Sequence, residues 1–428
     1  MFSDSTPVLC DYRTDGQILR PNEMPPRTLG NVRARPFRLI VALAITFAAL
    51  LELRSWQTVA HPYASAPASC NATPTPRRAK TITSVEFMQA AVNSYNALQV
   101  CFGGPKGSFR GPFVGLAAAW PESQALSALL YLANVPNAPA SVRSGIVQRM
   151  SVLKSYWDRK GGYFPSGRWF SSGRGVKKYD DNAWLGLDLI DAYLITHKAT
   201  YLDQARAVAT FETTGWSRNE HFADPGGLYW QQSKFKRHRN AVSTAGAALL
   251  NGQLYAVTGI KLYRNRAEQY LHWTTSALTL KNGLIGDQIS THGVVNNRVW
   301  SYNQGLVIAA NVSLYNSTKN PAYLAAARHL AHKSLFYLNY RNRLEEQPQV
   351  FDAIYFRSLM SLNAIAPDAR YLRALRSYAT YLYDRMVPST GVVHLGPMTT
   401  ASTGWLLTQA AATQVFTLMV STSHTLSA

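Results

Sequence analysis

The sequence is poor in cysteine and in acidic residues. Its 428 residues include only 3 cysteines and no Cys-x-x-Cys motif, so a zinc site is not expected. Cys70 and Cys101 could pair if that part of the chain lies outside the cell. The 43 Lys and Arg outnumber the 23 Asp and Glu, and the formal net charge of +20 favours a wall or membrane surface as partner. The basic residues are scattered without a recognised binding motif, so no nucleic-acid partner is expected.

The N-terminal part also lacks an apolar run of membrane-spanning length. Its uncharged run, residues 39–51, is shorter than a membrane span, which needs about 20 residues. We interpret residues 1–38 as a disordered basic segment, residues 39–54 as a signal-peptide core or membrane anchor, and residues 55–80 as an Ala/Pro/Ser/Thr linker. Arginines before the run predict export of everything after it. Cleavage and retention of the signal both stay open.

A series of alternating strands is missing from residues 81–428, where the pattern is helical throughout. A motif rich in Tyr, Leu, Ala and Arg recurs at the start of helices, near residues 201, 262, 323 and 371. Its spacing of about 50 to 60 residues indicates a repeated helical hairpin with a long return loop. We expect twelve helices, beginning near residues 84, 121, 140, 180, 200, 240, 261, 302, 321, 350, 368 and 402.

Six such hairpins can close into a double ring, in which inner helices line a bowl and outer helices cover them. An open superhelix of tetratricopeptide type is the competing shape, but its units have about 34 residues and are shorter than these. The expected fold is therefore all-α, with the ring as the favoured architecture.

Two adjacent carboxylates, Asp180 and Asp181, lie between a Gly-rich loop and an apolar helical run. In one interpretation Asp180 caps the helix and Asp181 interacts with its dipole. In the other, the pair is the nucleophile and acid of a retaining glycosidase, which requires two carboxyl groups about 5 Å apart. Neighbouring Cα atoms are about 3.8 Å apart, so diverging side chains can reach that separation. The spacing permits both interpretations.

Aromatic residues, amides and carboxylates recur in the loops that precede other inner helices. These segments are residues 226–230, 239–241, 283–287, 299–305 and 351–357. A sugar ring stacks its C–H face on Trp or Tyr and offers its hydroxyls to paired donors and acceptors. In a closed ring these loops gather at one rim, which predicts a carbohydrate-binding cleft there.

The strongest basic cluster lies in the loop that precedes one of these segments. It consists of Lys234, Lys236, Arg237, His238 and Arg239. We expect either a solvated loop face or a surface that faces the substrate, in which case the substrate carries phosphate.

Three blocks, in this order within residues 84–390, resemble glycoside hydrolase family 76. They are Tyr179-Asp180-Asp181-x-Ala183-Trp184, Gly227-x-x-Trp230 followed by Asn240-Ala241, and Trp300-Ser301-Tyr302-Asn303-Gln304-Gly305. That family contains endo-α-1,6-mannanases and related fungal wall transglycosidases. The resemblance implies an (α/α)6 barrel and a retaining mechanism.

The resemblance also implies the roles of individual residues. Asp180 would be the nucleophile and Asp181 the acid/base. No metal or other cofactor would be required. The residues expected at the mannose subsites are Tyr179, Trp184, Trp230, Asn240, Asp287, Trp300, Tyr302 and Asn303.

The expected activity is retaining endo-hydrolysis of α-1,6-mannosidic linkages in cell-wall or cell-envelope mannan, including lipid-linked mannan. The protein is expected outside the cytoplasm, secreted or held to the membrane by its N-terminal segment, and as a monomer. The alternatives are a mannan transglycosidase and a helical toroid that binds mannan without turnover. Fungal transglycosidases of the family usually end in a hydrophobic anchor signal, and the short apolar stretch at residues 415–420 favours the hydrolase.

Overall fold

The computed structural model describes residue 70 and residues 81–110, 116–167, 175–233, 238–394 and 403–425. These residues belong to one compact unit, Tyr63–Ala428. The segments expected at residues 1–38 and 39–54, and the 55–80 linker apart from Cys70, lie outside the described residues.

Twelve α-helices make up most of the described chain. Each begins within two residues of its expected start. They are α2 (Ser84–Phe102), α3 (Ala119–Ala133), α4 (Ala140–Val152), α5 (Tyr179–Thr196), α6 (Ala199–Glu212), α7 (Ala241–Thr258), α8 (Lys261–Leu278), α9 (Ser301–Thr318), α10 (Pro321–Asn339), α11 (Gln349–Asn363), α12 (Ala369–Tyr383) and α13 (Thr403–Thr425). Short 3-10 turns extend or follow several of them, including η5 (Tyr340–Asn342) after α10.

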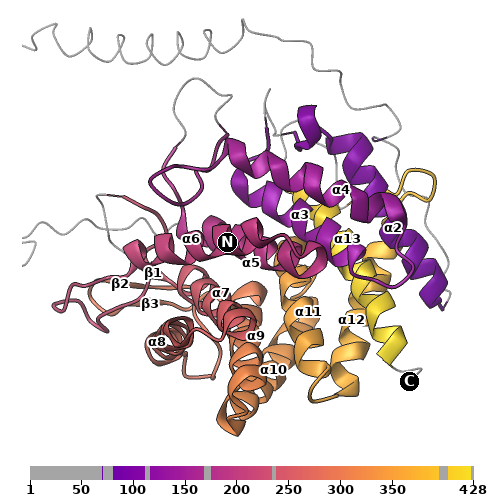
Figure 1. Ribbon diagram of the computed structural model, residues 1–428. Helices are drawn as coiled ribbons and strands as arrows, with labels where there is room; N and C mark the ends of the chain where they lie inside the picture. The colour runs from indigo at the N-terminus through magenta and orange to yellow at the C-terminus, as the bar shows by residue number, and fades with distance from the viewer. Residues whose placement is uncertain are drawn as a thin grey trace, which may run out of the picture. The chain divides into compact units, whose positions relative to one another are not determined.

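Six of the helices form a closed inner ring. Helices α3, α5, α7, α9, α11 and α13 each contact the next, and α13 also contacts α3. The outer helices α4, α6, α8 and α10 each pack on the inner helix that precedes them. The first outer helix, α2, packs on the last inner helix, α13, so the two ends of the domain complete one hairpin (Figure 1). This closure excludes the open superhelix and confirms the double ring.

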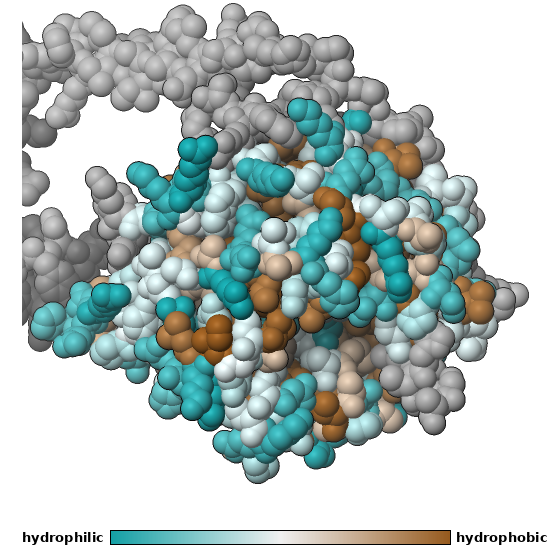
Figure 2. All heavy atoms as spheres, viewed as in Figure 1, coloured by the Kyte–Doolittle hydropathy of each residue, from teal (hydrophilic) through white to brown (hydrophobic). Residues whose placement is uncertain are grey.

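Inner and outer helices differ in how much of their surface is buried. The inner helix α5 is buried along almost its whole length from Tyr179 to Ala192. The outer helix α12 buries one stripe instead, which includes Tyr371, Leu375, Tyr378 and Leu382 at helical spacing. The face drawn in Figure 2 accordingly carries mainly hydrophilic residues, with scattered apolar ones between them.

Three hairpins share one turn geometry. Helices α5, α7 and α9 end at His197, Gly259 and Lys319, which all adopt the left-handed conformation, with φ of 55°, 68° and 58°. Each of these residues donates its backbone N–H to the carbonyl of the tyrosine four residues earlier. The same helix C-cap therefore precedes the recurring Tyr/Leu/Ala/Arg motif in three of its four occurrences.

A small antiparallel sheet was not expected from the sequence. Its strands β1 (His238–Asn240), β2 (Gln288–Ser290) and β3 (Val295–Asn296) pair in the order β1-β2-β3. Strands of two or three residues are too short to show alternation in a sequence. The sheet joins the loops before α7 and α9 and pairs Asn240 with Gln288.

For Arg239, the interpretation of the basic cluster as a solvated or substrate-facing surface is wrong. Its side chain is fully buried, and its guanidinium donates to four backbone carbonyls, those of Ala223, Asp224, Gly226 and Ser290. The planar five-donor group suits such a set of acceptors, so Arg239 fixes the loop at 223–226 against β2 and does not face a substrate. Residues 234–237 of the cluster lie outside the described residues.

Cys70 and Cys101 form a disulfide with an S–S distance of 2.02 Å. The bond fastens residue 70 to the end of α2. In the described ranges, none of the helices has the length and apolar character needed to span a membrane.

Candidate active site

The two carboxylates lie inside the first turn of α5. The helix starts at Tyr179, and the N-cap residue is Lys178, whose extended backbone makes no side-chain capping bond. The expectation that Asp180 is the capping residue is therefore wrong. Asp180 still accepts a first-turn N–H, that of Asp181, with Oδ1 at 2.9 Å.

Both carboxylate oxygens of Asp180 accept hydrogen bonds. Its Oδ2 accepts the indole N–H of Trp230 at 2.9 Å, in addition to the bond from Asp181 to Oδ1. The ammonium of Lys178 lies 4.4 Å from the centre of a Trp230 ring. Burial raises the pKa of Asp180 to about 6, and the two hydrogen bonds and the charge of Lys178 oppose that rise.

Asp181 has a different environment. Burial raises its pKa well above the usual range, the negative charge of Asp180 raises it further, and Lys178 lowers it. Only 7% of Asp181 is exposed. One carboxyl group is thus stabilised as an anion by two donors, while its neighbour favours the protonated form.

The pair faces a cavity of about 420 Å³ at the rim where the loops before the inner helices meet. Five of the inner helices contribute to it, through residues in their first two turns or directly before them. The lining residues besides Asp180 and Asp181 are Trp120, Lys178, Trp184, Trp230, Asn240, Val242, Asp287, Gln288, Trp300, Tyr302 and Phe351. Aromatic faces and amide or carboxylate groups therefore surround the dyad.

Six of the eight expected subsite residues line this cavity. They are Trp184, Trp230, Asn240, Asp287, Trp300 and Tyr302. The Asn240 side chain donates to Oε1 of Gln288 at 3.1 Å, across the β1–β2 pair. Tyr302 stacks on Phe351 with the ring centres 3.9 Å apart, and Trp300 meets the same ring edge-on at 5.3 Å.

Tyr179 does not line the cavity. It is 97% buried, since only 3% of it is exposed. Its ring stacks on Phe211 of α6 at 5.0 Å, and its hydroxyl pairs with that of Thr214 at 3.2 Å. One residue along a helix rotates the side chain by about 100°, so the neighbour of Asp180 points toward the outer helix and supports the first turn of α5.

Asn303 also lies outside the cavity lining, since it is fully buried on α9. Burial raises the pKa of Asp287, and the nearby side chains of Asn303 and Trp300 lower it. Asn303 therefore influences Asp287 from outside the cavity lining and exposes no surface to a sugar.

Five residues of the lining are absent from the expected site residues, namely Trp120, Lys178, Val242, Gln288 and Phe351. Phe351 belongs to the segment 351–357, which was expected at the rim. Trp120 packs against Trp184 with the ring centres 5.5 Å apart. A usable signal was available for Trp120, Val242 and Phe351, because each lies in the first turn of an inner helix, as Asp180 does. Among the described residues, no group of three or more His, Cys, Asp or Glu is arranged to hold a metal ion.

Comparison with known proteins identifies the family. A sequence model described as "Glycosyl hydrolase family 76" matches residues 82–418. The chain belongs to glycosyl hydrolase family 76. The match covers the double ring and the dyad.

Solved structures of this family share the fold. One from a bovine Bacteroides thetaiotaomicron strain has a TM-score of 0.68 at 21% identity and covers 79% of each chain. An inactive variant of the α-1,6-mannanase GH76A of Salegentibacter sp. HEL1_6, with two adjacent aspartates replaced, was solved with α-1,6-mannotriose. It has a TM-score of 0.62 at 19% identity and covers 78% of this chain and 99% of that one.

The curated relatives match a smaller part of the chain. The mannan endo-1,6-alpha-mannosidases DCW1 of Candida glabrata and Saccharomyces cerevisiae are each 26% identical over 164 residues, which is 34% of this chain. The match spans 37% and 36% of the length of these two relatives.

Proposed function

We propose that the protein is a retaining endo-glycosidase that cleaves α-1,6-mannosidic linkages in cell-wall or cell-envelope mannan. The observation that carries the proposal is the dyad itself. Asp180 and Asp181 are adjacent and face one aromatic cavity. Burial raises the pKa of Asp180 only to about 6, because two hydrogen bonds oppose it, while burial and the charge of Asp180 raise the pKa of Asp181 well above its usual range. The substrate class is supported by the names of the DCW1 relatives and by the mannotriose complex of the Salegentibacter enzyme.

In the first step, a carboxylate oxygen of Asp180 attacks the anomeric carbon while the glycosidic C–O bond breaks. Asp181 donates its proton to the leaving oxygen, and a glycosyl ester forms on Asp180. In the second step, Asp181 accepts a proton from water, and the water oxygen displaces Asp180 from the anomeric carbon. Two inversions retain the configuration of the sugar.

The surroundings of the dyad support these roles. The N–H groups of Trp230 and Asp181 stabilise the anion that attacks, and burial keeps the proton on Asp181 for the leaving group. Trp230, which is 42% exposed, and Tyr302 offer planar faces for sugar rings, and Asn240 offers hydrogen-bonding atoms for hydroxyls.

The proposed location is outside the cytoplasm. The Cys70–Cys101 disulfide supports it, because such bonds persist in oxidising compartments. Residues 39–54 serve as signal or anchor in this proposal, and the protein acts as a monomer. The net charge of +20 favours mannan on an anionic surface, including lipid-linked mannan.

The test is incubation of the full chain with linear α-1,6-mannan, with Asp180→Asn and Asp181→Asn as controls. We expect short mannosides from the wild type and from neither variant, with the α-configuration in the first product seen by NMR. An added acceptor mannoside reports transfer. If a folded wild type forms neither hydrolysis nor transfer products from free or lipid-linked mannan, the enzyme proposal fails and a mannan-binding toroid replaces it.

A further inference from the structure

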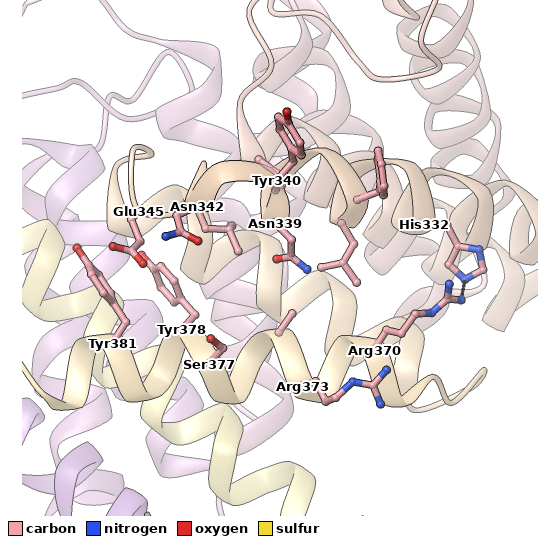
Figure 3. Close-up of a pocket in the computed structure, with 15 residues that line it drawn as sticks. His332, Asn339, Tyr340, Asn342, Glu345, Arg370, Arg373, Ser377, Tyr378 and Tyr381 are labelled. Atoms are coloured by element: carbon pink, nitrogen blue, oxygen red, sulfur yellow. Dashed lines mark hydrogen bonds between the residues drawn. The ribbon is translucent and has the colours of Figure 1, made fainter. Parts of the chain in front are cut away.

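A second cavity, of about 680 Å³, lies between the outer helices α10 and α12 (Figure 3). One wall is the C-terminal half of α10 with the turn η5 and the residues up to Glu345, and the other wall is α12. None of its lining residues belongs to the lining of the active-site cavity. Its volume is within the range of about 300 to 1,000 Å³ that small-ligand sites have.

The α12 wall presents an ordered aromatic face. Tyr381 is only partly buried, and its ring lies 3.7 Å from the guanidinium carbon of Arg385. Tyr381 also stacks on Tyr378, with ring centres 5.8 Å apart and planes at 27°. On the α10 side, Phe336 lines the cavity and is 79% exposed. A ring fixed by such contacts loses little freedom when a ligand stacks on it.

The η5 wall contains two consecutive left-handed residues that are not glycine. Arg341 has φ 54° and ψ 35°, and Asn342 has φ 57°. Asn tolerates this conformation, whereas Arg adopts it at a cost. The guanidiniums of Arg341 and Arg343 each lie 5.1 Å from the Tyr340 ring and hold the turn. Strained turns that neighbouring contacts maintain are frequent at binding sites.

Polar side chains on both walls are available to a ligand. Within the described residues, no hydrogen bond or ion pair involves the side chains of Asn339, Asn342, Glu345, Arg373 or Ser377. Figure 3 shows these residues along the two sides of the cavity. Amides, a hydroxyl and charged groups of both signs together supply paired donors and acceptors.

The charges on the lining side chains nearly offset one another. Glu345 and Arg373 carry opposite signs, and Arg370 forms an ion pair with Asp368 at 2.6 Å. The arginines that contact tyrosine rings beside the cavity are not among its lining residues. The lining itself therefore does not select an anion. Its aromatic face and its donor and acceptor groups suit a neutral, hydroxyl-rich ring instead.

We propose that this cavity is a second, non-catalytic carbohydrate site that holds a neutral pyranose segment of the mannan chain; this rests on the proposed function. The chain leads from Glu345 directly to α11, whose Phe351 lines the active-site cavity. The side chain of Gln347, between them, accepts the backbone N–H of Ser301 at the start of α9. The two sites are thus joined through one short, anchored connection. A polymer that engages both gains effective concentration, and a short oligosaccharide does not.

The first experiment compares kcat/KM of the full chain on polymeric α-1,6-mannan and on α-1,6-mannotetraose. The variants are Tyr381→Ala and the double variant Asn339→Ala/Arg373→Ala. The matched control is Arg328→Ala, an exposed arginine of α10 outside the cavity lining. We expect the ratio of polymer to tetraose activity to fall about tenfold in both variants and to stay constant in the control. An unchanged ratio overturns the second site.

The second experiment separates this proposal from the proposed function. Mannotetraose is titrated into the Asp181→Asn variant by NMR and calorimetry, with and without Tyr381→Ala. Two sites are expected, of which Tyr381→Ala removes one. A single site that survives Tyr381→Ala overturns the inference even where the wild type hydrolyses mannan. Absent turnover with two intact binding sites instead refutes the proposed activity alone.

Discussion

Trp230 links the aromatic wall of the active-site cavity to its proposed nucleophile. Asp180 accepts two hydrogen bonds. The one from the indole N–H of Trp230 joins residues far apart in the chain, with a separation of 50 residues. A hydrogen bond to a charged group contributes about 1.5 to 3 kcal/mol, and 1.36 kcal/mol corresponds to about one pKa unit. The ionisation of Asp180 therefore depends on this side chain.

We predict that Trp230→Phe raises the pKa of Asp180 above its value of about 6. Because the nucleophile must be ionised, the acidic limb of the kcat/KM profile moves to higher pH by about one unit, and activity at pH 5 falls about tenfold. Trp300→Phe is the matched control, since Trp300 lies in the same cavity without a hydrogen bond to Asp180. An acidic limb that stays in place in Trp230→Phe contradicts the prediction.

Lys178 acts on both carboxylates. Its charge lowers the pKa of Asp180 and of Asp181, against the effect of burial. Replacement by Met removes the charge and keeps the length of the side chain. We expect both limbs of the pH profile to shift to higher pH in Lys178→Met and to return in Lys178→Arg. A change in kcat with the same pH dependence would assign Lys178 to substrate contact alone.

At the scale of elements, the hairpin turns show how local residues define the ring. Gly259 ends α7 in the left-handed conformation, and a Cβ at this position would have no atom within 4 Å. A substitution there consequently tests backbone conformation without a steric clash.

We predict that Gly259→Ala lowers the free energy of unfolding by about 1 kcal/mol, because an L-residue is disfavoured at positive φ. Lys319→Gly, at the same turn position of the next hairpin, is expected to be neutral or stabilising by up to about 1 kcal/mol. Urea unfolding midpoints measure both. Equal effects of the same sign would show that the turn conformation does not matter to stability.

The buried side chain of Arg239 also holds neighbouring segments together. It connects the loop at 223–226 to β2, and β1 carries Asn240 to the cavity. A basic residue that looks like a substrate contact in the sequence is thus part of the frame that positions one.

At the scale of the whole molecule, the last helix closes the ring. The apolar stretch at residues 415–420 is fully or nearly buried on α13, which packs against α2, α3 and α11. Phe416 is fully buried, with its ring 6.3 Å from those of Phe87 and Tyr383. This stretch is a structural helix of the core.

We predict that Phe416→Ala lowers the free energy of unfolding by about 3 to 5 kcal/mol, as expected for a large side chain in a packed core. Leu407→Ala, at a partly buried position of the same helix, is expected to lower it by about 1 kcal/mol. Thermal and urea unfolding measure the difference. Similar small effects at both positions would mean that α13 is dispensable for the closed fold.

Local information in the chain was enough for the helices and for the dyad. Helix starts and ends depend on periodicity, caps and left-handed turn residues, all of which are short-range, so twelve starts were predicted within two residues. The adjacent Asp180 and Asp181 needed no long-range information, because their separation follows from their being neighbours.

Only the tertiary structure decided which side chains reach the cavity. A rotation of about 100° per residue turns Tyr179 to Phe211 while Asp180 faces the cavity, and the fully buried Asn303 lies outside the cavity lining. Strands β1 to β3, the burial of Arg239 and the cavity between α10 and α12 all depend on contacts between residues far apart in the chain. Closure of the ring determines such contacts, and no local pattern contains them.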